Sequence, residues 1–246
     1  MSASIDNAFQ FTPDTGGLVL VDKPLTWTSF NVVAKIRAAL LALCKHRVKV
    51  GHAGTLDPLA SGLLIIGTGS CTRILQGLTA EDKTYTATLR LGQTTPSHDA
   101  ETAVDSERPW EHIGPEAVRH VMHRFTGTIS QRPPDFSAKR FQGERSYFLA
   151  RKGKPVAMEA VDVTIHRLEL LGMQGPEVTL EVHCGKGTYI RSLAHDIGEA
   201  LGCGAFLSGL RRTGSGDLHV RDARTPDQWS AWLDEWAAGR AGFPVP

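Results

Sequence analysis

The stretch that most constrains this chain runs from Val48 to Gly67 and reads VKVGHAGTLDPLASGLLIIG. Its glycines permit tight turns and a close approach of the backbone to a ligand. Asp57 precedes Pro58, which fixes its own φ and favours an extended conformation at the aspartate. The apolar run 63–66 is too short for a helix and predicts a buried strand. The pattern therefore predicts an acid held on a rigid turn, beside a strand that enters the core.

Two interpretations of Asp57 are open at this point. An Asp-Pro turn can use the aspartate side chain to bond its own backbone, and the acid is then structural. A carboxylate on a rigid turn is also how a fold positions a reactive group. No Lys, Arg, Asp or Glu other than Asp57 lies between Lys49 and Arg73. The spacing alone does not decide between the two interpretations.

The composition bounds the class of protein. The 246 residues, 41% hydrophobic and 22% charged, are enough for one large domain or two small ones with a sizeable core. Because the net charge is only +1, the overall charge does not indicate a nucleic-acid partner, and only local basic patches could do so. Four cysteines form no CxxC pair, which predicts reduced thiols and a cytoplasmic protein rather than a zinc or disulfide framework. No signal peptide and no apolar run of roughly 18 residues are found, so no membrane contact is expected.

The periodicity predicts both strands and helices, and we expect an α+β fold with a mixed, mostly antiparallel sheet flanked by helices. We expect the site in a cleft across the sheet, as the family resemblance described below implies. Strands are expected over 17–21, 63–66, 83–91, 126–131, 161–171, 177–184 and 205–212. Helices are expected over 29–43 with Ser29 as the cap, 71–78, after Gly114, after a Thr188 cap up to Gly202, and after Thr225. Residues 93–109 have no periodicity and are expected to form a loop.

Two segments are rich in basic residues. Lys45, His46, Arg47 and Lys49 follow the first predicted helix, where they could hold phosphates or simply complement the negative end of the helix dipole. The segment 134–155 interleaves Phe136, Phe141, Tyr147 and Phe148 with basic side chains. These are Lys139, Arg140, Arg145, Arg151, Lys152 and Lys154. Such a segment could bind RNA by charge and stacking, or be a solvated basic loop.

Several short stretches, in this order along the chain, resemble the bacterial tRNA pseudouridine-55 synthases of the TruB family. They are KPLTWTS at 23–29, GHAGTLDPLASG at 51–62, KTY at 83–85, QRPPDFSAK at 131–139, GTYIR at 187–191 and LRR at 210–212. The resemblance covers residues 18–212, and GTLDPLASG is its most specific string. It implies the pseudouridine synthase fold and isomerisation of a uridine in the T loop of tRNA.

The resemblance also implies roles for individual residues. Asp57 matches the essential catalytic aspartate, and Arg191 matches the arginine that pairs with it. Tyr85 matches the tyrosine that stacks on the flipped uracil and helps to deprotonate C5. The remaining matches bind substrate: His52 enters the T loop, Tyr189 and Leu210 wall the base pocket, and Lys23 and Pro24 lie beside it. An arginine at the positive end of a helix is electrostatically disfavoured, which independently suggests that Arg191 interacts with a nearby carboxylate.

The implied reaction exchanges an N–C glycosidic bond for a C–C bond without net oxidation, so we expect no cofactor and no metal. Asp57 could act as a nucleophile or as a base toward the sugar, and the sequence leaves this open. The expected partner is the T arm of tRNA, with 134–155 as a clamping thumb. No obligate protein partner is expected, and the protein is expected to be a monomer.

The sequence departs from the family pattern in two places. Many members carry a PUA-type RNA-binding domain, and too few residues follow Arg212 for one, so we expect a single catalytic domain over 1–246 with a last helix at 225–238. The 95–101 loop lacks the usual glycine, and Asp99 is carried over only weakly.

Functions of other classes remain as alternatives. An RNA chaperone that opens the T loop without needing catalysis would share the same binding features. A carboxylate-dependent hydrolase needs a second acid near Asp57, which the loop does not offer. A P-loop enzyme needs a GxxxxGK[ST] string, which is absent.

Overall fold

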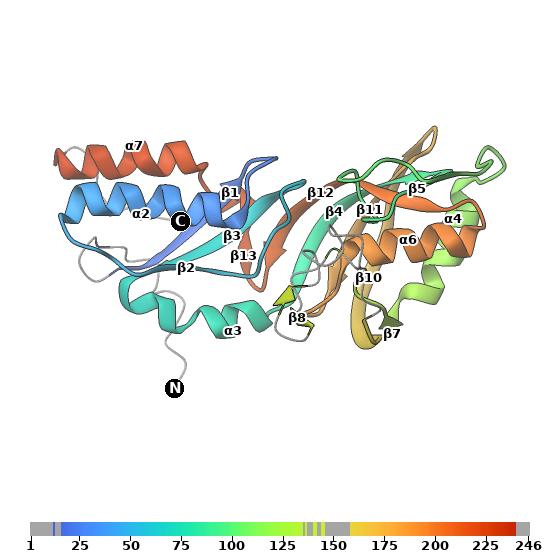
Figure 1. The fold of residues 1–246 in the computed structure, drawn as a ribbon, viewed down its shortest axis with the longest axis horizontal. Coiled ribbons are helices and arrows are strands. Elements are labelled where there is room, and N and C mark those ends of the chain that lie inside the picture. The colour runs from blue at the N-terminus through green and yellow to red at the C-terminus, as the bar shows by residue number, and fades with distance from the viewer. Residues whose placement is uncertain are drawn as a thin grey trace. The chain divides into compact units, whose positions relative to one another are not determined.

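The computed structural model describes residues 12, 16–134, 136, 140–141, 144–145 and 158–239. The chain divides into two compact units. The first comprises Met1–Lys83 with Arg211–Pro246, and the second comprises Thr84–Leu210. Figure 1 shows the elements of both, and each unit is described here by itself.

The sheet of the first unit is built on the apolar run predicted as a strand. β3 (Ala60–Thr68) pairs antiparallel with β1 (Leu18–Lys23) and with β2 (Val50–Ala53). The last part of β12 (Ala205–Ser215) also belongs to this sheet, and β13 (Leu218–His219) pairs with its end. The side chains of residues 63–66 are at most 1% exposed, which explains an uninterrupted apolar run in place of alternation.

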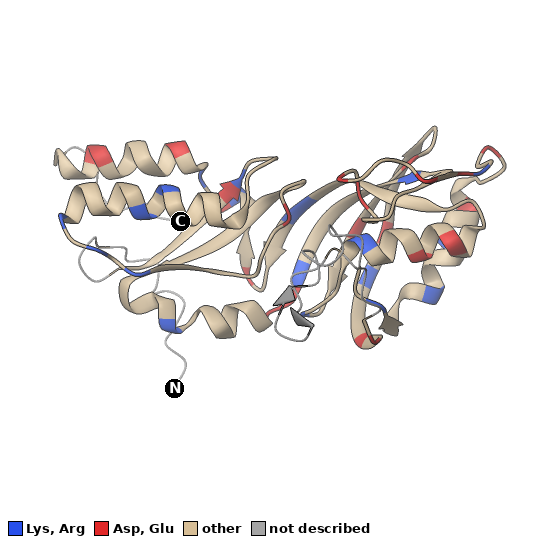
Figure 2. Cartoon of the chain, in the orientation of Figure 1, with Lys and Arg blue, Asp and Glu red and all other residues tan. Residues whose placement is uncertain are grey.

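Two helices of the first unit pack on one another. α2 (Ser29–Cys44) and α7 (Pro226–Ala237) are neighbours in Figure 1, and Figure 2 marks basic residues on α2 and acidic residues on α7. Lys35 Nζ lies 2.6 Å from Asp227 Oδ1. Trp229 is buried and donates its indole N–H to Leu20 O at 2.8 Å. The predicted tryptophan stripe therefore packs the last helix against β1.

The first unit corrects two predictions about helix ends. Thr28, not Ser29, caps α2. The Thr28 side chain accepts from Asn31 N, and the Asn31 side-chain oxygen accepts from Thr28 N. The helix expected over 71–78 is a 3₁₀ turn, η1 (Gly69–Arg73), followed by α3 (Leu75–Ala80). The turn tightens where Gly69 adopts φ +55°.

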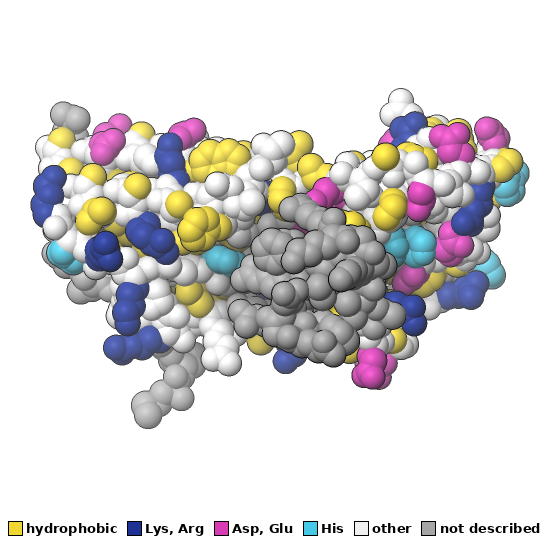
Figure 3. Space-filling model, viewed as in Figure 1, with side chains coloured by type: hydrophobic (Ala, Val, Ile, Leu, Met, Phe, Trp, Pro, Cys, Tyr) yellow, Lys and Arg dark blue, Asp and Glu magenta, His cyan; other side chains and the backbone are white. Residues whose placement is uncertain are grey.

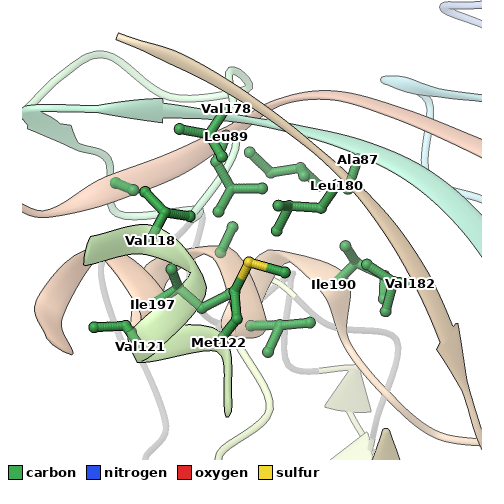
Figure 4. Packing of buried hydrophobic residues seen from close by; sticks show 14 of the residues in the cluster. Ala87, Leu89, Val118, Val121, Met122, Val178, Leu180, Val182, Ile190 and Ile197 are labelled. Atoms are coloured by element: carbon green, nitrogen blue, oxygen red, sulfur yellow. The ribbon is translucent and has the colours of Figure 1, made fainter. Parts of the chain in front are cut away.

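The strands of the second unit follow one another in the order β12, β4, β11, β10, β7. The strands are β4 (Lys83–Leu91), β7 (Gly127–Gln131), β10 (Val161–Gln174) and β11 (Glu177–Cys184), with the first part of β12. The helices are α4 (Pro115–Met122), η2 (His123–Phe125) and α6 (Ile190–Leu201). Figure 4 shows apolar side chains of β4 and β11 meeting those of α4 and α6 to form the core.

Two further predictions are corrected in this unit. The 93–109 loop contains a short antiparallel ribbon of β5 (Gln93–Thr94) and β6 (Ser106–Glu107), too short to leave a periodic signal. Thr188 does not cap α6, because its hydroxyl donates to Gly185 O, and Tyr189 takes the N-cap position. Gly202 ends α6 with φ +82°, as predicted.

The α+β prediction is confirmed. Pairings of β1 and β2 with β3, of β7 and β11 with β10, and of β13 with β12 are all antiparallel. Within the described ranges, no helix has the length and apolar character needed to cross a membrane.

Candidate active site

Asp57 lies in the connection between β2 and β3, which form a hairpin. Gly54 turns the chain away from β2 with φ +81°. Ala60 N donates to Asp57 O at 3.0 Å, and Thr26 N donates to Pro58 O at 2.8 Å. The backbone on both sides of the partly buried Asp57 is therefore fixed by hydrogen bonds.

Ser29 ties this loop to the start of α2. Its hydroxyl accepts from Leu56 N at 2.9 Å and donates to Leu56 O at 3.1 Å. Ser29 is 3% exposed and Leu56 is 4% exposed, so water does not compete with either bond. A serine predicted as a helix cap instead holds the residue next to Asp57.

Arg212 closes the loop from the opposite side. It is 2% exposed, and its guanidinium donates to Leu63 O at 2.7 Å and to Gly54 O at 3.2 Å. Gly62 adopts φ +101°, and a Cβ there would lie 2.2 Å from Arg212 O. The start of β3, directly after the Asp57 loop, thus fits closely against the backbone of β12. Sequence reasoning gave Arg212 no role, although the paired arginines at the end of a predicted strand were a signal.

Lys23 is the most buried charged residue beside this loop, with 0% exposure. Its ammonium donates to Trp27 O at 2.6 Å and to Pro24 O at 3.1 Å. The pKa of Lys23 is lowered from 10.5 to about 8, mainly by burial and in smaller part by Arg212, while the negative charge of Asp57 opposes the shift. Lys23 is therefore mostly protonated at neutral pH, so two buried cations accompany Asp57.

His52 lies on β2, opposite Ile66 of β3. Burial is the main reason that the pKa of His52 falls below its usual value, and Arg212 lowers it further, while the Gly54 backbone opposes the shift. The imidazole is therefore neutral at physiological pH. Pro24 follows Lys23 and is partly buried. These predicted site residues, with Asp57, all belong to the first unit.

The other predicted site residues belong to the second unit. Tyr85 and Leu210 are partly buried and pack against its core. Tyr189 is held at the start of α6 by Gln131, whose side chain accepts from Tyr189 N at 2.8 Å and donates to Tyr189 O at 3.1 Å. Gln131 is 1% exposed. It thus fixes the entry of α6, a role that no local pattern suggested.

Arg191 is buried, and the carboxylate described beside it is that of Asp99. Arg191 Nε lies 3.6 Å from Asp99 Oδ2, with both side chains below 10% exposure. The guanidinium also donates to Ser97 O at 3.3 Å and to Phe136 O at 3.0 Å. The expectation of a nearby carboxylate is met within this unit by Asp99.

The predicted RNA-binding residues of 134–155 are not described. Lys139, Arg151 and Lys152 lie outside the described residues, as do the side chains of Arg140 and Arg145. The backbones of β8 (Arg140–Phe141) and β9 (Glu144–Arg145) are described and form an antiparallel pair.

The other basic segment is exposed. Lys45 ends α2 in the left-handed conformation with φ +59°, so His46, Arg47 and Lys49 lie beyond the helix. On the face drawn in Figure 3, Lys and Arg side chains gather over α2 and the loop that follows it. This position is compatible with phosphate binding and with a favourable helix end alike.

Comparison with known families identifies the group to which these features belong. The family model described as TruB family pseudouridylate synthase (N terminal domain) matches residues 42–190. The chain belongs to the TruB family. A second TruB model, described as tRNA pseudouridylate synthase B C-terminal domain, matches residues 191–238. The resemblance seen in the short motifs is thereby confirmed.

Individual TruB relatives match over most of the chain. tRNA pseudouridine synthase B of Phocaeicola vulgatus is 49% identical over 221 residues, covering 89% of this chain and 94% of the relative. The protein of the same name from Parabacteroides distasonis is 47% identical over the same length and coverage. The predicted family and type of enzyme are confirmed by these relatives.

Solved structures confirm the pseudouridine synthase fold. A chain in the crystal structure of a Cbf5-Nop10-Gar1 complex matches with a TM-score of 0.72 and 31% identity, over 97% of this TruB chain and 59% of its own length. A chain in the structure of an H/ACA RNP bound to a substrate RNA containing 2'-deoxyuridine matches with a TM-score of 0.68 and 28% identity, over 94% and 60%. This chain thus spans about three fifths of the length of those two chains.

Proposed function

We propose that this TruB chain converts uridine to pseudouridine at position 55 in the T loop of tRNA, with Asp57 as its essential carboxylate. The observation that carries the proposal is the fixed Asp57 loop. Its backbone is held by Ser29 and Arg212, and the charged Lys23 lies beside it. The family membership and the printed names of the relatives supply the reaction and the class of substrate.

The reaction assigns a clear task to this loop. The bond from N1 of uracil to C1′ breaks, the base turns, and a bond from C5 to C1′ forms. The proton on C5 leaves and N1 takes up a proton, so the product is an isomer of the substrate. Asp57 acts on the sugar as a nucleophile or as a base, and both roles need a carboxylate whose position is fixed before the substrate arrives. The buried charges of Lys23 and Arg212 supply fixed positive charge around that carboxylate.

We assign the residues of the second unit to the base and to Asp57. Tyr85 stacks on the flipped uracil and helps to remove the C5 proton, and Tyr189 and Leu210 wall the base pocket. Arg191 pairs with the reacting carboxylate in the substrate complex. Extruding a base from its stack costs a few kcal/mol, which ring stacking and pocket contacts offset.

RNA binding is assigned to further residues. His52 contacts the T loop, and Lys23 with Pro24 supports the pocket from the first unit. The segment 134–155 clamps the T arm through Lys139, Arg140, Arg145, Arg151 and Lys152. We assign residues 1–246 to one catalytic domain in which 225–238, observed as α7, packs the last helix against β1.

The deciding experiment is tritium release from [5-³H]uridine-labelled tRNA by the wild type and by Asp57→Asn. Asp217→Asn, an exposed aspartate in the turn between β12 and β13, is the matched control. We expect release by the wild type and the control and none by Asp57→Asn, with tRNA affinity retained by all three.

The other outcomes identify what failed. Equal release by all three proteins would make Asp57 structural and end the assignment of the site. No release by the wild type, with tight tRNA binding, would overturn the isomerase proposal in favour of an RNA chaperone.

A further inference from the structure

Two histidines that the proposed reaction does not use are stacked in the second unit. The rings of His98 and His195 are parallel to within 1°, with centroids 3.9 Å apart. His195 lies on α6, one helical turn after Arg191, and positions i and i+4 of a helix share a face. His98 lies between Ser97 and Asp99, two of the residues that contact Arg191. The stack therefore joins the helix that carries Arg191 to the turn that holds it.

The backbone at His98 explains how the turn serves both sides. His98 adopts φ +60°, a left-handed conformation in which histidine is one of the few enriched residues other than glycine. Its N–H donates to Thr95 O at 3.1 Å, and its carbonyl accepts from Leu207 N at 3.0 Å. This sharp turn directs both neighbours of His98 to Arg191 while the His98 ring meets His195.

The surroundings of the stack favour a neutral His98 ring. The Nδ1 atoms of His98 and His195 are buried and have no hydrogen-bond partner among the described residues. A proton added there would create a buried donor without an acceptor, which is costly. Burial is the main cause that lowers the pKa of His98 to about 4, and His195 and Arg191 add to it.

The charged groups around the pair do not reverse this preference. Asp105 and Glu199 oppose the lowering of the His98 pKa, but more weakly than burial lowers it. Asp196 attracts positive charge on His195, although burial raises the pKa of Asp196 itself. Asp99 is paired with Arg191. The neutral His98 ring is thus the stable form at physiological pH.

We propose that the stacked His98–His195 pair is a positioning element, which holds the turn at Ser97–Asp99 against Arg191 and so fixes the guanidinium for catalysis. The catalytic use of Arg191 rests on the proposed function. The alternative is that hydrogen bonds within the turn suffice, since Thr95 Oγ1 donates to Asp99 O at 2.6 Å. Removing a ring without disturbing the backbone distinguishes the two.

Three substitutions isolate the ring stack. His98→Asn removes a ring but keeps a residue that tolerates positive φ. His195→Ala removes the other ring at a helical position, where alanine is favourable. His195→Phe restores a ring that stacks and cannot take up a proton. His120→Asn, at an exposed position on α4, is the matched control.

The first readout is independent of activity. The Nε–H signal of Arg191, assigned through its loss in Arg191→Lys, reports how well the guanidinium is held. We expect solvent exchange of this proton to accelerate about tenfold or more in His98→Asn and His195→Ala. It should stay near the wild-type rate in His195→Phe and in the control. Unchanged exchange in both ring-deletion variants, or equally fast exchange in His195→Phe, would overturn the proposal.

The second readout is the single-turnover rate of tritium release at saturating protein. A displaced Arg191 should slow this rate about tenfold in the two ring-deletion variants, with tRNA affinity unchanged and recovery in His195→Phe. Wild-type rates in both ring-deletion variants would also overturn the proposal. A wild type that releases no tritium would overturn the proposed function instead, and Arg191 exchange would still decide the positioning role.

Discussion

Lys23 carries a charge in a place without exposed surface, and this has a measurable consequence for stability. The unfolded chain keeps the Lys23 proton up to about pH 10.5, whereas the folded protein releases it above about pH 8. Between these values the unfolded state binds more protons, so the free energy of unfolding rises with pH. The full effect is about 3 kcal/mol, of which about 2 kcal/mol falls between pH 7 and 9.5.

The substitution Lys23→Met isolates this effect. The unfolding free energy of the wild type minus that of the variant should increase by about 2 kcal/mol from pH 7 to pH 9.5, measured by urea denaturation. Other groups titrate alike in both proteins and cancel in the difference. A difference that stays flat over this range would mean that Lys23 is hydrated in solution.

Gly62 and Gly77 form a matched pair for the backbone. Gly62→Ala places a Cβ against Arg212 O at a φ of +101°, so we expect a loss of about 3 kcal/mol or more and a marked loss of activity. Gly77 lies in α3 with no atom within 4 Å of an added Cβ, so Gly77→Ala should stabilise by about 0.5–1 kcal/mol. Urea denaturation of both variants checks this, and similar effects of the two would contradict the close approach of Gly62 to β12.

At the level of elements, the contribution of the N-terminal cap of α7 to stability can be tested. The Thr225 hydroxyl accepts from Gln228 N at 3.2 Å, and the Gln228 side-chain oxygen accepts from Thr225 N. Thr225→Ala removes this cap and should cost about 1 kcal/mol. Lys35→Ala breaks an exposed ion pair between α2 and α7 and should cost about 0.5 kcal/mol or less. Thermal unfolding compares the two, and a larger effect of Lys35→Ala would contradict this ranking.

Elements with a strong periodic signal were predicted from the sequence. Each of these elements buries one face or all of its side chains, and burial requires apolar residues at regular positions. Examples are the alternation of 83–91, the apolar run after Asp57 and the tryptophan stripe of α7. The two-residue strands β5 and β6 leave no such pattern. Their pairing depends on partners more than ten residues away.

The motifs supplied the residues of the candidate site but not the contacts that hold them. Ser29 looked like a helix cap because it precedes an apolar stripe, yet Thr28 fills that role and frees Ser29 to bind Leu56. The contact of Arg212 with Gly54 spans 158 residues, and no local rule connects positions so far apart. The same holds for Gln131 at Tyr189.

For the whole molecule, the net charge of +1 means that tRNA affinity must come from local basic clusters. The logarithm of the association constant should fall linearly with the logarithm of salt concentration, by about 0.7–0.9 per phosphate neutralised. Replacing Lys45, Arg47 and Lys49 with Gln separates the two interpretations of the loop after α2. A slope reduced by about 1–2 would assign the loop to phosphate binding.

The contrary result has its own signature. If these three residues only complement the end of α2, the salt slope of tRNA binding stays at the wild-type value while the melting temperature falls slightly. Lys186→Gln, in the exposed turn before α6, controls for the general loss of positive charge. Filter binding at several salt concentrations and thermal melting together give the answer.

The contact of Arg212 with the Asp57 loop also determines when, during synthesis of the chain, this loop can reach its final structure. Gly54 leaves the ribosome 158 residues before the arginine that closes its loop. At a synthesis rate of about 5–20 residues per second, the growing chain spends about 8–30 s with that loop open. Under the proposed function, uridines would therefore meet a finished reaction centre only after Arg212 has been synthesised, and products of synthesis interrupted before Arg212 would leave tRNA unmodified.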